Sequence, residues 1–142
     1  MPREMTHEEA RAFLLDGTRT GKLATARADG RPHVTPIWFT LDGDEIVFTT
    51  HGTSIKAKSI QSDPRVCFCV DDQAPPYSYV MLEGTATLSE DLDDLVRWAT
   101  VIGSRYMGAD RAEEFGIRNG VPGELLVRIT PTRAVTRAAM TD

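Results

Sequence analysis

Two Asp-Gly dipeptides constrain the fold of this chain more than any other feature. Asp29-Gly30 and Asp42-Gly43 interrupt residues 21–50, GKLATARADGRPHVTPIWFTLDGDEIVFTT, whose remaining runs resemble strands. Asp-Gly favours the positive φ angles that tight β-hairpin turns require. The segment therefore predicts a meander of three antiparallel strands.

The rest of the chain alternates between helical and strand patterns. Thr6 and Glu9 form a capping-box pattern that opens a short helix, which Gly17 ends. Further helices are predicted over residues 54–61, residues 90–107 with Ser89 as the cap, and residues 111–118. Further strands are predicted over residues 63–72, 74–89 and 123–138, the last of which Pro131 can divide into two. Six or seven short antiparallel strands with a few helices predict a mainly β fold, a small β-barrel with flanking helices that forms one domain over residues 1–142.

Size and composition exclude several classes of protein. The chain has 142 residues, of which 41% are hydrophobic and 26% are charged, and its formal net charge is −5. It contains no long basic run, so nucleic-acid binding is not expected. No apolar run approaches the roughly 20 residues that a membrane helix needs, and the N-terminus lacks a signal peptide. A cytoplasmic protein is therefore the expectation.

The two cysteines, Cys67 and Cys69, alternate in the strand-like run RVCFCV. They are too close for a usual structural disulfide and too few for a closed zinc site. We expect two small buried hydrophobic residues and no metal site.

One stretch, FTTHGTSIKAKSI over residues 48–60, combines hydroxyls and lysines at the expected start of a helix. Helix N-termini carry unpaired N–H groups and a partial positive charge, so they attract anions. Thr50, Thr53 and Ser54 can donate to phosphate oxygens, and Lys56 adds a charge. Lys58 cannot share the direction of Lys56 in a regular helix. The alternative is an ordinary capped, solvated helix.

A proline interrupts the strand that precedes this stretch. Pro36 lies within RPHVTPIWFT, and proline cannot donate to a strand ladder. The break can free backbone groups near Thr35 and Ile37 to bind the edge of a planar heterocycle. The alternative is a plain edge strand. Nucleophile-elbow, zinc-protease, Walker and Rossmann motifs are all missing from the sequence.

With these elements in place, the chain resembles the pyridoxamine-phosphate-oxidase-like flavin and deazaflavin reductases, which share the FMN-binding split β-barrel. The resemblance rests on GKLATARADGRPHVTPIWF, DEIVFTTHGTSIKAKSIQSDPRVCFCVDD, VMLEGTATLSED and GELLVRITPTRA, in that order. The similarity is greatest to the actinobacterial branch that uses the deazaflavin coenzyme F420.

The resemblance implies a cofactor site and a homodimer. Cofactor-binding residues around the phosphate would be Thr49, Thr50, Ser54, Lys56 and, as an auxiliary, Lys58. The strand that lines the ring would supply Val34, Thr35, Pro36, Ile37 and Trp38. The cofactor would lie between two subunits, with Pro76, Tyr77, Ser78 and Tyr79 contributed by the partner chain.

Two departures from the family pattern argue against vitamin B6 oxidation. Thr35 and Ile55 stand where the oxidases carry arginines. The resemblance therefore implies an F420-dependent reductase that transfers a hydride between F420 and a small organic acceptor. The alternatives are an FMN-dependent oxidoreductase and a non-catalytic binder of F420 or haem, for which His33 and His51 are the nearest candidate axial ligands.

Overall fold

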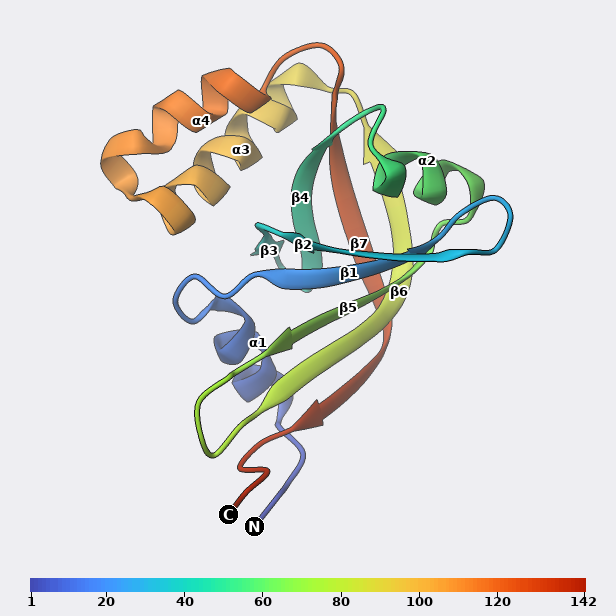
Figure 1. Cartoon of the computed structure of the whole chain (residues 1–142). Helices are drawn as coiled ribbons and strands as arrows, with labels where there is room; N and C mark the ends of the chain where they lie inside the picture. The colour runs from blue at the N-terminus through green and yellow to red at the C-terminus, as the bar shows by residue number, and fades with distance from the viewer.

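Seven strands form one antiparallel sheet, which curls into a barrel with helices on its outside and at its end (Figure 1). This computed structural model describes all 142 residues. The strands are β1 (Gly21–Ala26), β2 (Pro32–Ile37), β3 (Thr40–Asp42), β4 (Glu45–His51), β5 (Arg65–Asp71), β6 (Tyr79–Ser89) and β7 (Glu124–Arg137). The helices are α1 (His7–Leu15), α2 (Ile55–Ser62), α3 (Leu92–Met107) and α4 (Ala112–Asn119), with a 3₁₀ turn, η1 (Ala109–Arg111), before α4. The mainly β class with flanking helices is confirmed.

Both predicted hairpins form, but the predicted meander is wrong. Gly30 and Gly43 have φ angles of 87° and 60° at the β1–β2 and β3–β4 turns. The sheet order is β2-β1-β5-β6-β7-β4-β3, so β2 and β3 lie at opposite ends of it. The chain leaves the ladder after Ile37, and β4 pairs with β7 instead. The 14-residue β7 runs unbroken through Pro131 and pairs with both β6 and β4. Because β4 and β7 are far apart in the chain, no local sequence pattern signals that they pair.

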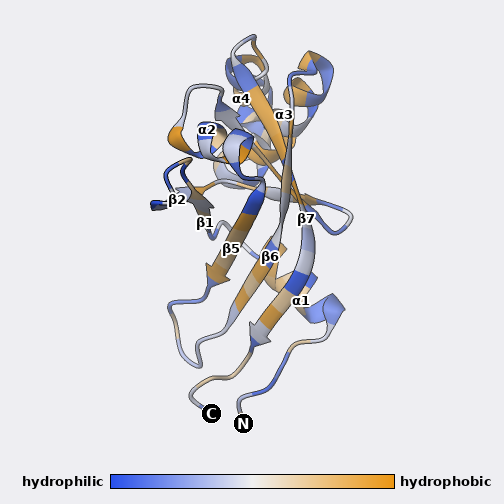
Figure 2. Cartoon of the chain, turned by 90° about the vertical axis from the view of Figure 1, so that its right-hand side faces the viewer, coloured by the Kyte–Doolittle hydropathy of each residue, from blue (hydrophilic) through white to orange (hydrophobic).

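The barrel interior holds the main hydrophobic core. Phe39, Phe48 and Phe68 are fully buried there, and the rings of Phe39 and Phe68 meet edge to face at 4.8 Å. Figure 2 shows the hydrophobic residues concentrated on the strands. Burial of this many large apolar side chains is the main stabilising contribution to the fold.

A second, smaller core joins α3 to the outer face of β4 and β7. Leu95 and Trp98 of α3 pack there against Val47 and Leu126. Trp98 is thus a packing residue. The other two helices that meet the sheet, α1 and α2, place Leu14 and Ile60 in the main core, so they pack on its inner side and leave the outer faces of β1, β5 and β6 uncovered (Figure 1).

Helix starts follow the sequence signals with one correction. The capping box of Thr6 and Glu9 is present, and Ser54 caps α2. The cap of the long helix is Asp91 rather than Ser89, because Ser89 still belongs to β6. No helix of the structure has both the length and the apolar character needed to cross a membrane.

The cysteines also differ from expectation. Cys67 and Cys69 are free thiols on the outer face of β5, and each is half-buried rather than buried. Their partial burial raises the pKa of both thiols, and nearby Glu83 and Asp71 raise the pKa of Cys67 and Cys69 respectively. Both thiols are therefore poor nucleophiles near neutral pH.

Candidate functional site

Part of the predicted ring-lining strand and part of the predicted phosphate-binding stretch meet at one pocket of about 260 Å³. The end of β2 forms one side, the end of β4 and the start of α2 form another, and α3 and α4 close the third. The pocket is lined by Pro36, Ile37, Trp38, Thr49, Thr50, Lys56, Ala99, Ile102, Gly103, Phe115 and Asn119. Six of these residues were predicted, and we call this cavity the Lys56 pocket.

The start of α2 brings several polar groups beside this pocket, of which Thr50 and Lys56 line it directly. The Ser54 hydroxyl accepts from the Ala57 amide at 3.1 Å and lies 2.9 Å from the hydroxyl of Thr50. The backbone amides of Ile55 and Lys56 have no acceptor within the protein. Free amides at a helix start and two hydroxyls form an arrangement that binds oxyanions.

Lys56 supplies the positive charge of the pocket. Its ammonium makes no ion pair, and partial burial lowers its pKa from the ordinary value of 10.5. An uncompensated cation in a partly desolvated pocket is stabilised by any anion that enters. The donor set therefore fits a phosphate group.

Trp38 forms the aromatic wall and is held in place by α3 and α4. Its ring stacks on Tyr106 at 5.0 Å with an interplanar angle of 2°, and it lies 5.7 Å from the ring of Phe115. The Tyr106 hydroxyl donates to the carbonyl of Arg19 at 2.8 Å, and burial raises the pKa of this phenol. The indole of Trp38 remains 39% exposed, so part of it is available to a ligand.

Arg105 anchors the end of α3 to the barrel. Its guanidinium donates to the carbonyls of Gly17, Phe39 and Leu14 at 3.0, 2.7 and 2.7 Å. Three carbonyl acceptors in place of a carboxylate leave the local charge positive. The anchor fixes the helix that carries much of the pocket wall.

Four of the residues predicted around the ring and the phosphate, Val34, Thr35, Ser54 and Lys58, do not line the Lys56 pocket. Val34 points to the outer face of β2 and is 65% exposed, and the hydroxyl of Thr35 contacts the next carbonyl. β2 is an edge strand that pairs only with β1. An edge strand tolerates proline, so Pro36 does not require an interruption of the hydrogen-bond ladder. Lys58 lies on the other side of α2, as helical geometry predicts, beside Arg27 and Arg31 of the β1–β2 hairpin.

The segment Pro76–Tyr79 lies far from the Lys56 pocket of its own chain. It belongs to the β5–β6 turn, at the opposite end of the molecule from α2 and close to the C-terminus (Figure 1). The amides of Met140 and Thr141 donate to the carbonyls of Tyr77 and Pro76. Within one chain these residues take no part in the site.

Sequence reasoning missed the wall formed by α3 and α4. Ala99, Ile102 and Gly103 of α3, with Phe115 and Asn119 of α4, line the pocket. Ala99 and Ile102, together with Leu95, form an apolar stripe at helical spacing within the helix predicted over residues 90–107. That stripe pointed only to packing, because periodicity shows which side of a helix is covered and not what covers it.

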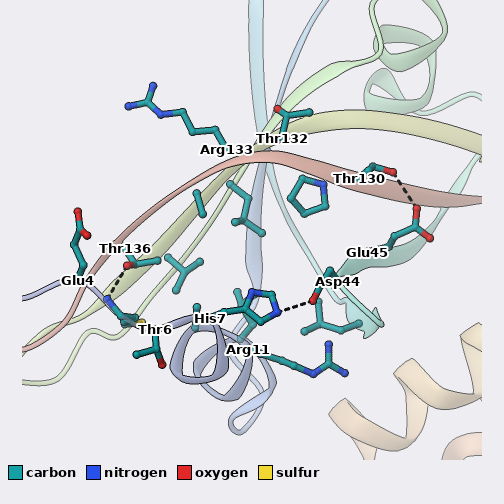
Figure 3. Close-up of a pocket in the computed structure, with 18 residues that line it drawn as sticks. Glu4, Thr6, His7, Arg11, Asp44, Glu45, Thr130, Thr132, Arg133 and Thr136 are labelled. Carbon is teal, nitrogen blue, oxygen red and sulfur yellow. Dashed lines mark hydrogen bonds and ion pairs between the residues drawn. The ribbon is translucent and has the colours of Figure 1, made fainter.

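A larger cavity of about 680 Å³ lies between α1, the β3–β4 turn and β7, and it contains none of the predicted residues. Figure 3 shows His7 of α1 and Asp44 of the β3–β4 turn meeting across it, 3.0 Å apart. Glu45 accepts from Thr130 at 3.0 Å and also pairs with Arg128. Its charged rim is largely paired internally, and its floor is apolar, so it has no comparable set of free donors.

Comparison with known proteins identifies the family and the fold of this chain. A family model described as pyridoxamine 5'-phosphate oxidase matches residues 6–138. A crystal structure of a conserved hypothetical protein from Mycobacterium tuberculosis superposes with a TM-score of 0.86 and 30% identity, covering 96% of this chain and 87% of that one. A structure of an F420 reductase has a TM-score of 0.69 and 27% identity, covering 87% of this chain and 94% of that one. A haem storage protein from Vibrio cholerae, at 17% identity and a TM-score of 0.73 over 92% of this chain and 94% of that one, shares the fold alone.

Proposed function

The chain belongs to the pyridoxamine 5'-phosphate oxidase family, and we propose that it is an F420-dependent oxidoreductase. In this proposal, it transfers a hydride between the deazaflavin coenzyme F420 and a small organic acceptor. The observation that carries the proposal is the Lys56 pocket, where an oxyanion site adjoins an aromatic wall. A phosphate-bearing ring cofactor requires both elements side by side.

The residues of the pocket divide into two groups with different roles. Lys56, Thr50 and the free amides of α2 would hold the phosphate. Trp38 and Phe115 would lie against the ring and exclude water from one side of it. The bound cofactor would supply the hydride chemistry, and no side chain of the pocket needs to act as a nucleophile.

F420 is preferred over FMN for two reasons. Ile55 occupies the position at which the phosphate site of the oxidases carries arginine, so the site here has one fewer charge. The F420 reductase similar to this chain covers most of its length at 27% identity. For the same reasons, we expect less activity toward vitamin B6 compounds than the oxidases have.

We further propose a homodimer in which the uncovered outer face of the sheet is the interface. Strand alternation places Ala24, Val34, Cys67, Cys69 and Met81 on that face, and adjacent members are paired across the ladder. The same face also carries Lys22 opposite Cys69 and Glu83 opposite Cys67, so its apolar members form a cluster among charged residues, as in many protein interfaces. The segment Pro76–Tyr79 would then contribute to the site of the partner chain.

Parallel binding titrations with F420, FMN and haem test the proposed cofactor. We expect F420 to bind more tightly than FMN, and reduced F420 to be oxidised when unsaturated ketones, quinones or tetrapyrroles are added. If FMN binds more tightly and the purified protein shows a flavin spectrum, FMN is the cofactor and the proposal of F420 is wrong. F420 binding without turnover of any acceptor would indicate a carrier.

Haem binding is the least supported alternative. A Soret band would require an axial ligand, and neither His33 nor His51 lines the Lys56 pocket. We therefore expect no Soret band.

A further inference from the structure

We infer that the β1–β2 hairpin and α2 form a second oxyanion site, separate from the Lys56 pocket, which takes a phosphate or carboxylate group. We call its residues the hairpin cluster: Thr25, Arg27, Arg31, His33 and Lys58. The hairpin extends alongside α2 (Figure 1). A cavity of about 320 Å³ opens between them, lined by Arg27, Ala28, Arg31, Ile55, Lys58 and Ser59.

Strand register brings the members of the hairpin cluster together. Thr25 of β1 lies directly opposite His33 of β2, so their side chains share one face of the hairpin. Arg27 follows two residues after Thr25, and its amide donates to the carbonyl of Arg31 at 3.0 Å. Lys58 reaches the same cavity from α2.

Three buried polar atoms of the hairpin cluster have no hydrogen-bond partner in the protein: Thr25 Oγ1, Arg27 Nε and His33 Nδ1. Thr25 is only 4% exposed. Leaving a buried donor unsatisfied costs about 1–3 kcal/mol, so a group of such atoms in one place calls for an explanation. Of the three residues only Arg27 lines the cavity, so a bound ligand that accepts hydrogen bonds would meet the guanidinium of Arg27 directly, whereas Thr25 and His33 are not among the lining residues.

The charges of the cluster specify the sign of that ligand. Arg31 is paired with Asp29, whose carboxylate lies 2.7 Å from the guanidinium, and this pair leaves no net charge. Arg27 and Lys58 form no ion pair and no side-chain hydrogen bond, although the charge of Arg27 helps to lower the pKa of the nearby Asp29 carboxylate. Three cations and one carboxylate therefore leave two positive charges in excess. Two uncompensated cations, with a hydroxyl and an imidazole beside them, favour an oxyanion with several acceptor atoms.

The hairpin cluster is close enough to the Lys56 pocket for one molecule to reach both. His33 and Ile37 lie on the same face of β2, four residues apart, which corresponds to about 13 Å along a strand. Ile37 lines the Lys56 pocket, and α2 presents Lys56 to one site and Lys58 to the other. The oxyanion can therefore be a second acidic group of the ligand in the Lys56 pocket, an assignment that rests on the proposed function, or a separate anion.

A phosphate titration followed by amide NMR tests the site without any cofactor. At constant ionic strength, inorganic phosphate should produce saturable shifts in residues 27–33. The double variant Arg27→Gln, Lys58→Gln should lose at least about tenfold in affinity there, since it removes both free cations. Lys56→Met should keep the shifts in residues 27–33 and lose those of Thr50, and Arg3→Gln, which removes a distant surface charge, should change neither set.

The inference is overturned if the shifts in residues 27–33 do not saturate, or if the double variant binds phosphate as the wild type does. Because the side chains of Arg27 and Lys58 make no hydrogen bond or ion pair within the protein, we also expect an unchanged Tm for the double variant. If the double variant is unfolded, Arg27→Lys, which keeps the charge, should bind phosphate, and otherwise the inference fails. Adding saturating F420 or FMN to the phosphate-bound protein then shows whether the oxyanion is part of the cofactor or a separate anion. Displaced phosphate indicates a second acidic group of the cofactor, and simultaneous binding indicates a separate anion. If neither cofactor binds, the proposed function is wrong, but the phosphate titration still shows whether the hairpin cluster binds an oxyanion.

Discussion

Lys56 is the residue on which the proposed cofactor site most depends. It is the cation of the pocket, it has no ion-pair partner, and its pKa is lowered by burial. Lys56→Met should weaken binding of F420 or FMN by ten- to a hundredfold, since a charged hydrogen bond contributes about 1.5–3 kcal/mol. Lys56→Arg should retain most of the affinity. A fluorescence titration measures both, and unchanged affinity in Lys56→Met would show that the phosphate binds elsewhere.

The same lysine predicts how binding depends on pH. The lowered pKa means that the free protein loses the Lys56 proton below pH 10.5, whereas a bound phosphate favours the ammonium. Affinity should therefore be highest at neutral pH and fall as the pH rises through the pKa of the free protein. The fall should disappear in Lys56→Arg, because arginine keeps its charge throughout this range. A fall of equal size in both proteins would assign the effect to another group.

Two buried threonines form a matched pair that tests the unpartnered hydroxyl. Thr25 Oγ1 has no partner, whereas the hydroxyl of Thr136 accepts from the Met5 amide at 2.9 Å. Thr25→Val should leave the free energy of unfolding unchanged or raise it by up to about 1 kcal/mol, and Thr136→Val should lower it by about 1–3 kcal/mol. Urea denaturation without added anions measures both changes. Equal destabilisation would mean that Thr25 has a partner after all.

At the scale of elements, the close approach of α3 and α4 shapes the wall of the pocket. Gly103 permits it, since a Cβ at this position would lie 2.6 Å from the Cβ of Phe115. Both residues line the Lys56 pocket, so the contact that joins the two helices also sets the width of the site. Neither helix could be assigned to the site from its own periodicity.

Gly103→Ala should therefore destabilise the protein although alanine is the better helix former. Helix propensity alone would stabilise it by about 1 kcal/mol, whereas forced overpacking costs about 1–3 kcal/mol. We expect a lower Tm together with altered cofactor affinity, because Phe115 must move. Thermal unfolding and a cofactor titration measure the two effects. A higher Tm would show that α4 can move away from the added methyl group without loss of stability.

At the scale of the whole molecule, the prediction concerns the uncovered face of the sheet. Val34→Glu and Met81→Glu each place a charge on this face and should convert a dimer to monomers, with loss of cofactor binding. Val101→Glu on the exposed side of α3 is the matched control and should remain dimeric. Light scattering after size exclusion measures the mass. Dimers in all three variants would place the interface on another surface.

Much of the fold was predictable because its signals are local. The Asp-Gly turns gave both hairpins, and the capping pattern of Thr6 and Glu9 gave the start of α1. The order of the strands was not predictable in the same way. The pairing of β4 with β7 joins residues about 80 positions apart, such as Ile46 and Ile129, and no local pattern specifies such a partner.

The division is the same for the site. By itself, the sequence indicated the residues proposed for the polar half, with Thr50 before α2, Ser54 at its cap and Lys56 about half a turn in, because capping and helix polarity act within a few residues. Only the tertiary structure decided that Phe115 and Asn119 close the pocket, that Lys58 faces the β1–β2 hairpin, and that Cys67 and Cys69 are half-exposed. These outcomes depend on which distant elements pack together and which face remains uncovered. The physical reason is that the burial of a residue depends on distant elements that pack only in the assembled molecule, whereas turn and cap preferences depend on residues next to each other in the chain.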